Sequence, residues 1–519
     1  MEAVGLALSI VATIDIAINH GHALVEMCRS FRKADVEIEH RVVLIESSMF
    51  RTNSQLQLIK QMHDELDDDF KTMQLRLYNA FTAKLKDVIG RLERLVEQNV
   101  SEDGSPSFSV KRGKYIFVKQ YLDAAIEEME RWQTRFDPTW KLITLKLESS
   151  AVDSLLKGHD DAMNEDDSGA SSLKATRALR GIVKNGTSSG VSVFLPARQL
   201  EGMDVKRIPF STASMYSNSK RRCLVDSIDL GVEHVDKSRT KALAKNVRDL
   251  AEKLQFVESA RVGMLQCKGF VVRKEGGFRI IFRQPPGTDN DRAPKSLREM
   301  LISAVEHSLT ERMNIAKQLT RAVSYIHSLG FVHKNIRPET IIGFWIEKQK
   351  GSLESVFLTG FSQFRAEHNA TGKLGDAAWE KNLYRHPERQ GMHPEEEYVM
   401  QHDIYSLGVC LLELGLWTSF AEYDAEEKAS RGKLLSLVTE ATDPKTAEDS
   451  KKMLVAMARR QLPSRMGDRY CGIVVNCLTC LDSDNEDFAD ESEFQDESGI
   501  QLGVRYMEKI MLALEDIEI

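Results

Sequence analysis

The 519-residue sequence lacks the features of several functional classes. A formal net charge of -8 gives the chain no overall basic character with which to attract nucleic acid. Its seven cysteines are scattered, which suits a reducing compartment better than a disulfide framework. No basic residue precedes Arg29, so we expect neither a secretory signal nor a transit peptide. These absences, together with the lack of an internal repeat, favour a cytoplasmic protein that does not bind nucleic acid.

Length and composition indicate more than one domain. At 58.7 kDa, with 42% hydrophobic and 29% charged residues, the chain is globular and too long for a single hydrophobic core. An acidic, Ser- and Gly-rich stretch at 160–172 predicts a flexible tether, and we place the linker at 151–181. The chain is thereby divided into residues 1–150 and 182–519.

Residues 1–150 carry apolar side chains at helical spacing. Two long segments, and a third that Pro138 interrupts, show the i, i+3, i+4, i+7 pattern of amphipathic helices, with a break at 99–107. The pattern predicts an antiparallel helical bundle without strands. The residues that set it are Ile38, Val42, Ile45, Met49, Leu56 and Ile59, then Phe70, Met73, Leu77, Phe81, Leu85, Ile89, Leu92 and Val96, then Phe117, Tyr121, Met129, Trp132 and Phe136.

The opening stretch "MEAVGLALSIVATIDIAI" is apolar on nearly every side of a helix, which is typical of a helix buried in a core or in lipid. It is shorter than the roughly 20 residues that span a bilayer, and Asp15 would be costly there. We therefore expect the central helix of the bundle, buried at rest, with a membrane-active segment as the alternative. The candidate membrane-active residues are Val4, Leu6, Leu8, Ile10, Val11, Ile14, Asp15 and Ile18.

The stretch "FVHKNIRPETIIGF" at 331–344 matches the catalytic-loop pattern H-R-D-L-x-x-x-N of protein kinases in register, beginning at His333. The position of the catalytic base is Asn335, whose neutral amide cannot accept a proton as a carboxylate does. The position of the metal-binding amide is Thr340, a poorer ligand. The frame of the loop is therefore present without its reactive groups.

Three further segments follow in kinase order. "VFLTGFSQFR" replaces the D-F-G motif and puts Gly360 at the metal-binding Asp, followed by Phe361 and Ser362. "LYRHPERQG" resembles the A-P-E segment through Pro387 and Glu388, and "HDIYSLGVCLLELGLW" resembles the long helix that opens with a buried Asp, here Asp403. We expect no catalytic residue, metal or cofactor.

The part before residue 286 is less informative. Gly186 and Gly190 lack the spacing of a phosphate-binding loop and indicate an ordinary turn. The likeliest third strand, at 221–231, shows Ser227 and Ile228 where a kinase has its phosphate-clamping Lys, while Lys220 and Lys237 flank it as surface residues. No phosphate-clamping Lys can be named. "CLTC" at 477–480 predicts a buried helix rather than a zinc or redox site.

Two resemblances follow from these motifs. "MEAVGLALSIVATIDIAINHGHALVEM" and the long helices after it resemble the HeLo-type domain of fungal cell-death and heterokaryon-incompatibility proteins, related to the prion-inhibition and propagation domain. The later motifs, with "LPSRMGDRYCGIVVNCL" and "GVRYMEKIMLALEDI", are similar to the degenerate kinase domains fused to such bundles. The order also resembles mixed-lineage kinase domain-like proteins. An acidic run at 482–498, expected to be a solvated loop, departs from the kinase pattern and leaves the partner of Glu388 in doubt.

The resemblance implies a multidomain protein: an all-α helical bundle at 1–150, then an α+β bilobal protein kinase-like fold, with an N-lobe at about 182–285 and a C-lobe at about 286–519. It implies an inactive kinase-like sensor that releases the bundle to oligomerise and permeabilise membranes in programmed cell death, after a signal from an upstream protein. Partners would be membrane lipids and further copies of the chain. Two alternatives remain: a divergent kinase that uses Asp376 or Glu380, and a non-lytic adaptor in fungal immune signalling.

Overall fold

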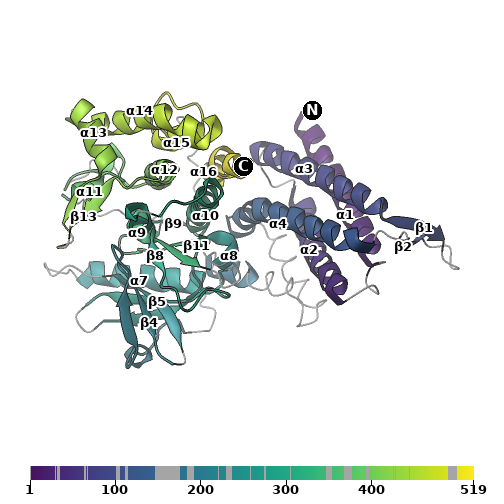
Figure 1. Cartoon of the computed structure of the whole chain (residues 1–519), viewed down its shortest axis with the longest axis horizontal. Coiled ribbons are helices and arrows are strands. Elements are labelled where there is room, and N and C mark those ends of the chain that lie inside the picture. The colour runs from purple at the N-terminus through teal and green to yellow at the C-terminus, as the bar shows by residue number, and fades with distance from the viewer. Residues whose placement is uncertain are drawn as a thin grey trace. The chain divides into compact units, whose positions relative to one another are not determined.

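The computed structural model divides into two compact units, Met1–Ala178 and Leu179–Ile519 (Figure 1). The residues it describes are 2–29, 31, 36–63, 66, 68–100, 106–110, 115–146, 176–183, 192–219, 221–228, 237–257, 259–273, 276–303, 305–345, 353–366, 377–392, 397–424, 426, 428–442, 445–488 and 500–518. Most of the expected linker, including its 160–172 centre, lies outside these residues.

Unit 1 is built from long helices, coloured purple to blue in Figure 1. Helix α1 packs on α2 and α3, and α4 packs on α2 and α3. The core contains Tyr78, Phe81, Trp132 and Phe136, with the rings of Phe81 and Trp132 stacked 4.1 Å apart. The helices are α1 (Glu2–Arg29), α2 (Val36–Met62), α3 (Asp68–Glu93) and α4 (Tyr115–Lys146).

The sequence missed two features of unit 1. A two-stranded antiparallel hairpin, β1 (Val96–Val100) and β2 (Pro106–Val110), lies where only a break was predicted. Helix α4 also continues through Pro138, which was expected to interrupt it. A proline inside a helix costs about 3 kcal/mol. The last turns of α4 bury Trp140, Leu142 and Ile143, each of which contributes roughly 1.5 to 3 kcal/mol, so packing outweighs that cost.

Unit 2 begins with a five-stranded antiparallel sheet in the order β3-β4-β5-β7-β6. Consecutive residues are buried along β5, β6 and β7, so both faces of the sheet are covered there, and α7 (Lys237–Leu254) packs against β6 and β7. The strands are β3 (Asp204–Arg207), β4 (Ala213–Ser217), β5 (Arg222–Ile228), β6 (Cys267–Val272) and β7 (Phe278–Arg283). A short helix, α8 (Ser259–Val262), precedes β6.

The rest of unit 2 is mainly helical. Helix α12 is buried along its whole length and packs on α10, α14 and α15. The helices are α9 (Leu297–Ile302), α10 (Leu309–Ser328), α11 (Trp379–Asn382), α12 (Met400–Leu416), α13 (Lys433–Thr442), α14 (Ala447–Met466), α15 (Asp468–Leu478), α16 (Ile500–Tyr506) and α17 (Ala513–Glu515), with a π-helix, η6 (Met507–Leu512), between the last two and 3-10 turns η2 (Ala197–Gln199), η3 (Pro338–Thr340) and η4 (Pro387–Arg389).

Short strands frame the loops between these helices. They are β8 (Lys295–Ser296), β9 (Phe331–Val332), β10 (Ile341–Trp345), β11 (Leu353–Leu358), β12 (Arg365–Ala366), β13 (Ala421–Tyr423) and β14 (Ala429–Arg431). The pairs β10–β11 and β9–β12 bring the segment at 333–340 beside the segment at 359–364. A helical region followed by a mixed helix-and-sheet region confirms the predicted fold class and is consistent with a kinase-like bilobal fold.

Candidate functional site

The buried carboxylate of Asp403, at the start of α12, fixes the beginning of the loop at 333–340 by hydrogen bonds. Its two oxygens accept hydrogen bonds from the backbone N–H groups of His333 (2.7 Å) and Lys334 (2.9 Å), and Tyr398 donates a third (2.7 Å). Burial alone would raise the pKa of Asp403. The hydrogen bond and the charge of His327 oppose burial and outweigh it, so the pKa lies below its ordinary value. An ionised Asp403 therefore fixes the backbone of the loop, including the left-handed Lys334 (φ 65°).

Asn335, at the predicted base position, is fully engaged by its own chain. Its Nδ2 donates to the carbonyl oxygen of Gly360 (2.9 Å) and to Ser362 Oγ (3.3 Å), and its Oδ1 accepts from Arg337 Nε (3.0 Å). The side chain thus cross-links the loop to the segment that replaces D-F-G. A neutral amide in this geometry supplies neither a base nor a free metal ligand.

The residues at the two predicted metal positions, Thr340 and Gly360, are in contact, and the Thr340 side chain lies where a side chain at position 360 would begin. Gly360 has φ +82°, and a Cβ built on it would lie 2.2 Å from Thr340 Cγ2 and 2.7 Å from Thr340 Cβ. Thr340 is itself fixed, because its hydroxyl donates to the carbonyl groups of Asn335 and Arg337 (both 2.9 Å). An Asp at position 360 would need a rearrangement of the loop before it could reach a metal.

Asp226 on β5 was missed by the sequence analysis, which put Ser227 and Ile228 at the position of the clamping Lys. Asp226 Oδ2 accepts hydrogen bonds from the backbone N–H groups of Gly360 (2.8 Å) and Phe361 (3.0 Å). Strand alternation puts Asp226 and Ser227 on opposite faces, so one residue of register decides which side chain faces this segment. Burial raises the pKa of Asp226, and hydrogen bonds from Thr212 and the two backbone groups partly oppose that shift.

The loop between β3 and β4, at 208–212, contains no glycine and lies near Asp226. Thr212 Oγ1 donates to Asp226 Oδ1 (2.8 Å), Ser296 Oγ donates to the Pro209 carbonyl (2.8 Å), and the Phe210 ring lies 5.1 Å from that of Tyr423. The loop is therefore fixed to residues beyond the sheet. The expected glycine turn at Gly186 and Gly190, and the side chains of Lys220 and Lys237, lie outside the described residues.

A polar cavity of about 390 Å³ remains beside this loop. Arg337, Glu339 and Glu380 line it, so the proposed substitute carboxylate Glu380 does face the cleft region, whereas Asp376 lies outside the described residues. The residues that line the cavity are Arg207, Phe210, Ser211, Thr212, Ser227, Arg337, Glu339, Glu380 and Tyr423.

Arg298 on α9 connects the loop to α12 and was not singled out by the sequence analysis. Its fully buried guanidinium donates to Glu339 Oε1 (3.0 Å) and to Glu413 Oε1 (2.7 Å), and also bonds Ser419 and Tyr384. Removing one partner of such a buried ion network costs about 3 to 5 kcal/mol. Buried ion pairs of Arg298 therefore connect this loop to α12.

Pro387 opens η4, and Glu388 lies beside two buried histidines rather than an arginine. His386 Nδ1 and His402 Nε2 lie 3.4 and 3.6 Å from Glu388 Oε2, and the three groups could hold a metal by distance alone. His402 Nδ1, however, accepts a hydrogen bond from the Val399 N–H (2.9 Å), which puts the ring proton on Nε2. A metal-bound histidine donates from its second nitrogen instead, so this cluster does not fit a metal.

His333 and Phe361 are buried and pack against one another. The two rings lie 5.0 Å apart, and His333 Nε2 is 3.0 Å from the carbonyl oxygen of Thr359. Burial lowers the pKa of His333 to about 4, with Asp403 and the Thr359 carbonyl partly opposing that shift. His333 is therefore neutral at physiological pH and packs as part of the core.

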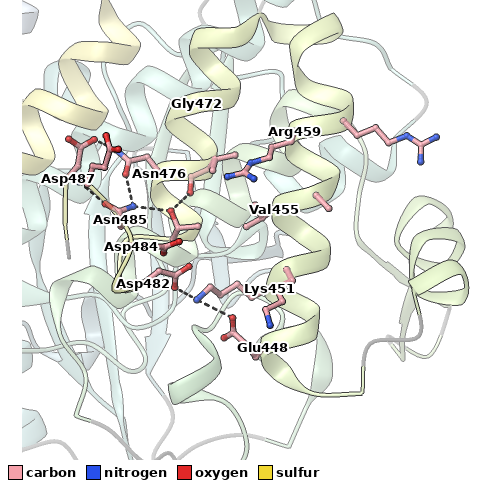
Figure 2. Close-up of a pocket in the computed structure, with 16 residues that line it drawn as sticks. Glu448, Lys451, Val455, Arg459, Gly472, Asn476, Asp482, Asp484, Asn485 and Asp487 are labelled. Carbon is pink, nitrogen blue, oxygen red and sulfur yellow. Dashed lines mark hydrogen bonds and ion pairs between the residues drawn. The ribbon is translucent and has the colours of Figure 1, made fainter.

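Another cavity, of about 970 Å³, lies between α14, α15 and the loop at 482–487 (Figure 2). Its charged walls pair with each other: Lys451 binds Asp482 and lies 3.6 Å from Glu448 Oε1. Asn485 donates to Asn476 (2.9 Å). At 482–488 the acidic run is a loop, as expected, in which Ser483, Asp484 and Glu486 are exposed, while Asp482 and Asp487 pair with Lys451 and Lys509. Residues 489–498 lie outside the described part. Cys477 and Cys480 are buried thiols, as expected.

The opening helix of unit 1 is only partly buried, which corrects the expectation of a central helix. Ile10, Ile14 and Ile18 face the core, whereas Leu8 is 66% and Ile16 is 47% exposed. Leu6, Val11 and Asp15 are half-buried, and Asp15 Oδ1 pairs with Lys60 Nζ at 2.5 Å. The side chain of Val4 lies outside the described residues. By length and hydropathy, residues Leu6–Arg29 could cross a membrane, which is weak evidence for one helix.

Comparison with known proteins gives a weak similarity to a kinase over a small part of the chain. The chain is 29% identical over 84 residues to "Probable serine/threonine-protein kinase FMP48" of Saccharomyces cerevisiae, which is 14% of this chain and 23% of that protein. The chain therefore spans about a quarter of the length of this curated relative. No protein-family model matches the chain.

Proposed function

We propose that this protein is a kinase-related switch without phosphotransferase activity, in which unit 2 controls membrane attack by unit 1. The observation that carries the first half is a group of residues that we call the filled cleft: Asn335, Thr340 and Asp226, packed around Gly360. By motif and strand order, these three stand where a kinase places its base, a metal ligand and its clamping Lys. Phosphoryl transfer depends almost entirely on positioning and charge stabilisation, and these residues supply neither.

The carboxylate of Asp226 is the strongest single support. It stands, buried, on the third strand of the sheet and is bonded to the backbone of the D-F-G-like segment. Asp226 brings no positive charge with which to hold the phosphates of a nucleotide, whereas a kinase attracts them with Lys and Mg²⁺. The similarity to a probable kinase over 84 residues is in keeping with descent from an enzyme whose cleft was later filled.

The second half of the proposal rests on unit 1. Its first helix presents Leu8 and Ile16 to solvent although each contributes roughly 1.5 to 3 kcal/mol when transferred to an apolar medium. The resemblance to HeLo-type domains suggests cell death or heterokaryon incompatibility as the setting. We propose further that an upstream protein changes the state of unit 2. The switch protein then moves from the cytoplasm to the membrane as a homo-oligomer.

Two measurements test the two halves separately. Full-length protein incubated with ATP and either Mg²⁺ or Mn²⁺ should transfer no phosphate to itself or to a general protein substrate. Robust transfer that Glu380→Gln abolishes would instead establish the divergent-kinase alternative. Leakage of a dye from liposomes should be greater for residues 1–178 than for the full chain. A folded fragment that causes no leakage would favour the adaptor alternative.

A further inference from the structure

A second cavity, of about 360 Å³, lies on the sheet of unit 2 away from the filled cleft. It is formed where the start of β5 and the end of β7 meet the segment at 199–203. Its volume falls in the range of small-molecule sites. None of the residues in the filled cleft lines it.

The rim of this cavity carries four cations and no carboxylate: Arg221, Arg222, Lys268 and Arg283. Among the described residues, none of the four forms an ion pair. Arg222 Nη1 donates to Asn290 and Lys268 Nζ lies 3.3 Å from Gln199 Oε1, so two of them are oriented by neutral amides. Arg222 Nε is buried without a hydrogen-bond partner.

Strand register explains why this charge is concentrated. Cys223 on β5 is paired with Arg283 on β7, so their side chains share one face, and Arg221 lies two residues before Cys223 on the same face. Like charges on neighbouring strands destabilise a sheet, and an anion between them removes that cost. One guanidinium group can donate two parallel hydrogen bonds to two oxygens of a phosphate. A phosphate has enough oxygens for two arginines, so it is the anion that best fits this rim.

The floor of the cavity is apolar. Leu200 and Met203 pack against the buried cluster that contains Cys223 and Ile281. A bare inorganic anion would leave this floor in contact with water, whereas a phosphate ester with a carbon skeleton covers it. The lining therefore combines a charged rim for phosphate with a floor for the rest of the molecule.

We propose that this cavity binds a phosphate ester, with Arg221 and Arg283 on the phosphate oxygens and the carbon skeleton over Leu200 and Met203. The ligand is either a soluble phosphate ester or the phosphorylated headgroup of a lipid, which share this chemistry. The inference is independent of the function proposed above, since it uses no residue of the filled cleft or of unit 1.

Pyrophosphate is the first probe, titrated calorimetrically into the full-length protein. We expect saturable binding that weakens as salt is raised, and at least a tenfold loss of affinity in Arg221→Gln/Arg283→Gln, whose two sites are exposed. The control is Lys206→Gln/Lys245→Gln, which removes the same charge from exposed positions outside the cavity and should change affinity less than twofold. Absence of pyrophosphate binding, or equal loss in both variants, would overturn the proposal.

Vesicles then identify the source of the phosphate. Full-length protein is sedimented with phosphatidylcholine vesicles, with and without phosphatidylinositol bisphosphate. Extra binding to the phosphorylated vesicles that Arg221→Gln/Arg283→Gln removes assigns the site to a lipid headgroup. Pyrophosphate binding without that extra retention assigns it to a soluble ester, and both results support the site.

Discussion

The Thr340 side chain leaves no room for a side chain at position 360, where Gly360 stands. A Cβ on Gly360 would lie 2.2 Å from the Thr340 methyl carbon, a distance that non-bonded carbon atoms do not reach. The glycine also adopts φ +82°, which L side chains rarely tolerate. The glycine at position 360 and the threonine at position 340 are therefore structurally linked, because a side chain at 360 requires a change at 340.

Gly360→Ala should lower the free energy of unfolding by about 2 to 4 kcal/mol, the sum of backbone strain and the clash. Thr340→Ser removes the clashing methyl and keeps the hydroxyl, so the double variant should recover part of this loss. Gly391→Ala is the matched control, because Gly391 has φ +78° with no atom near its Cβ and should lose only about 1 to 2 kcal/mol. Denaturant unfolding measures all four, and equal losses at 360 and 391 would contradict the clash.

ATP should give no Mg²⁺-dependent rise in melting temperature. A ligand stabilises the fold only as RT ln(1 + [L]/Kd), and the buried Asp226 is a carboxyl group that cannot attract phosphate as a Lys does. The measurement is made in the Arg221→Gln/Arg283→Gln background, which removes any phosphate binding on the sheet. A shift that requires Mg²⁺ there would show that the cleft accepts a nucleotide despite Asp226.

The stability of unit 2 should fall as pH drops from 6.5 to about 4 because of His333. Burial lowers the pKa of His333 from 6.5 to about 4, so the unfolded chain takes up the proton first. Above pH 6.5 His333 is neutral in the folded and the unfolded chain, so it does not reduce stability. Below about pH 4 His333 is charged in both, and the loss of stability has reached its full size. His333→Gln should make unfolding less pH-dependent across this window by on the order of 3 kcal/mol. Chemical denaturation at several pH values measures this dependence, and an equal pH dependence in the variant and the parent protein would show that His333 is not the cause.

Motif order and spacing allowed the frame of the cleft to be predicted. The register that begins at His333 places Asn335, Thr340 and Gly360 together, as expected, because a loop and a neighbouring turn are fixed by local sequence. Asp226 could not be predicted in the same way. It comes from a strand about 130 residues earlier, and a slip of one residue turns a strand side chain to the other face.

The errors in unit 1 have a related cause. Helical periodicity identifies which residues are apolar, but the packing partners decide which of them are buried. Helix α1 is apolar on nearly every side, so its sequence alone could not show that Ile14 faces the core while Leu8 and Ile16 face solvent. Pro138 is tolerated for the same reason, since the burial of distant side chains overrides a local preference.

Two ion pairs between α2 and α4 should differ in their contribution to stability because they differ in burial. Arg51 and Asp137 are 9% and 4% exposed and lie 2.9 Å apart, whereas Arg41 and Asp123 are 24% and 51% exposed at 2.7 Å. Asp137→Ala should cost about 3 to 5 kcal/mol by leaving Arg51 charged and buried, while Asp123→Ala should cost less than about 1 kcal/mol. Urea unfolding of the 1–178 fragment compares them, and similar losses would count against burial as the cause.

The exposed side of α1 should be the part of unit 1 that meets lipid. Leu8 and Ile16 lie two turns apart on the helix and are both exposed, so Leu8→Glu/Ile16→Glu should abolish liposome leakage without unfolding the bundle. Substitution of the buried Ile10 would not separate the two effects, because a charge there costs the fold itself. Asn79→Glu/Ala80→Glu, at exposed positions of α3, adds the same charge away from α1 and should leave leakage intact. Circular dichroism and melting temperature are measured beside dye release for each variant. If a folded Leu8→Glu/Ile16→Glu protein, or a folded protein lacking residues 1–18, still releases the dye, the membrane activity belongs to another helix.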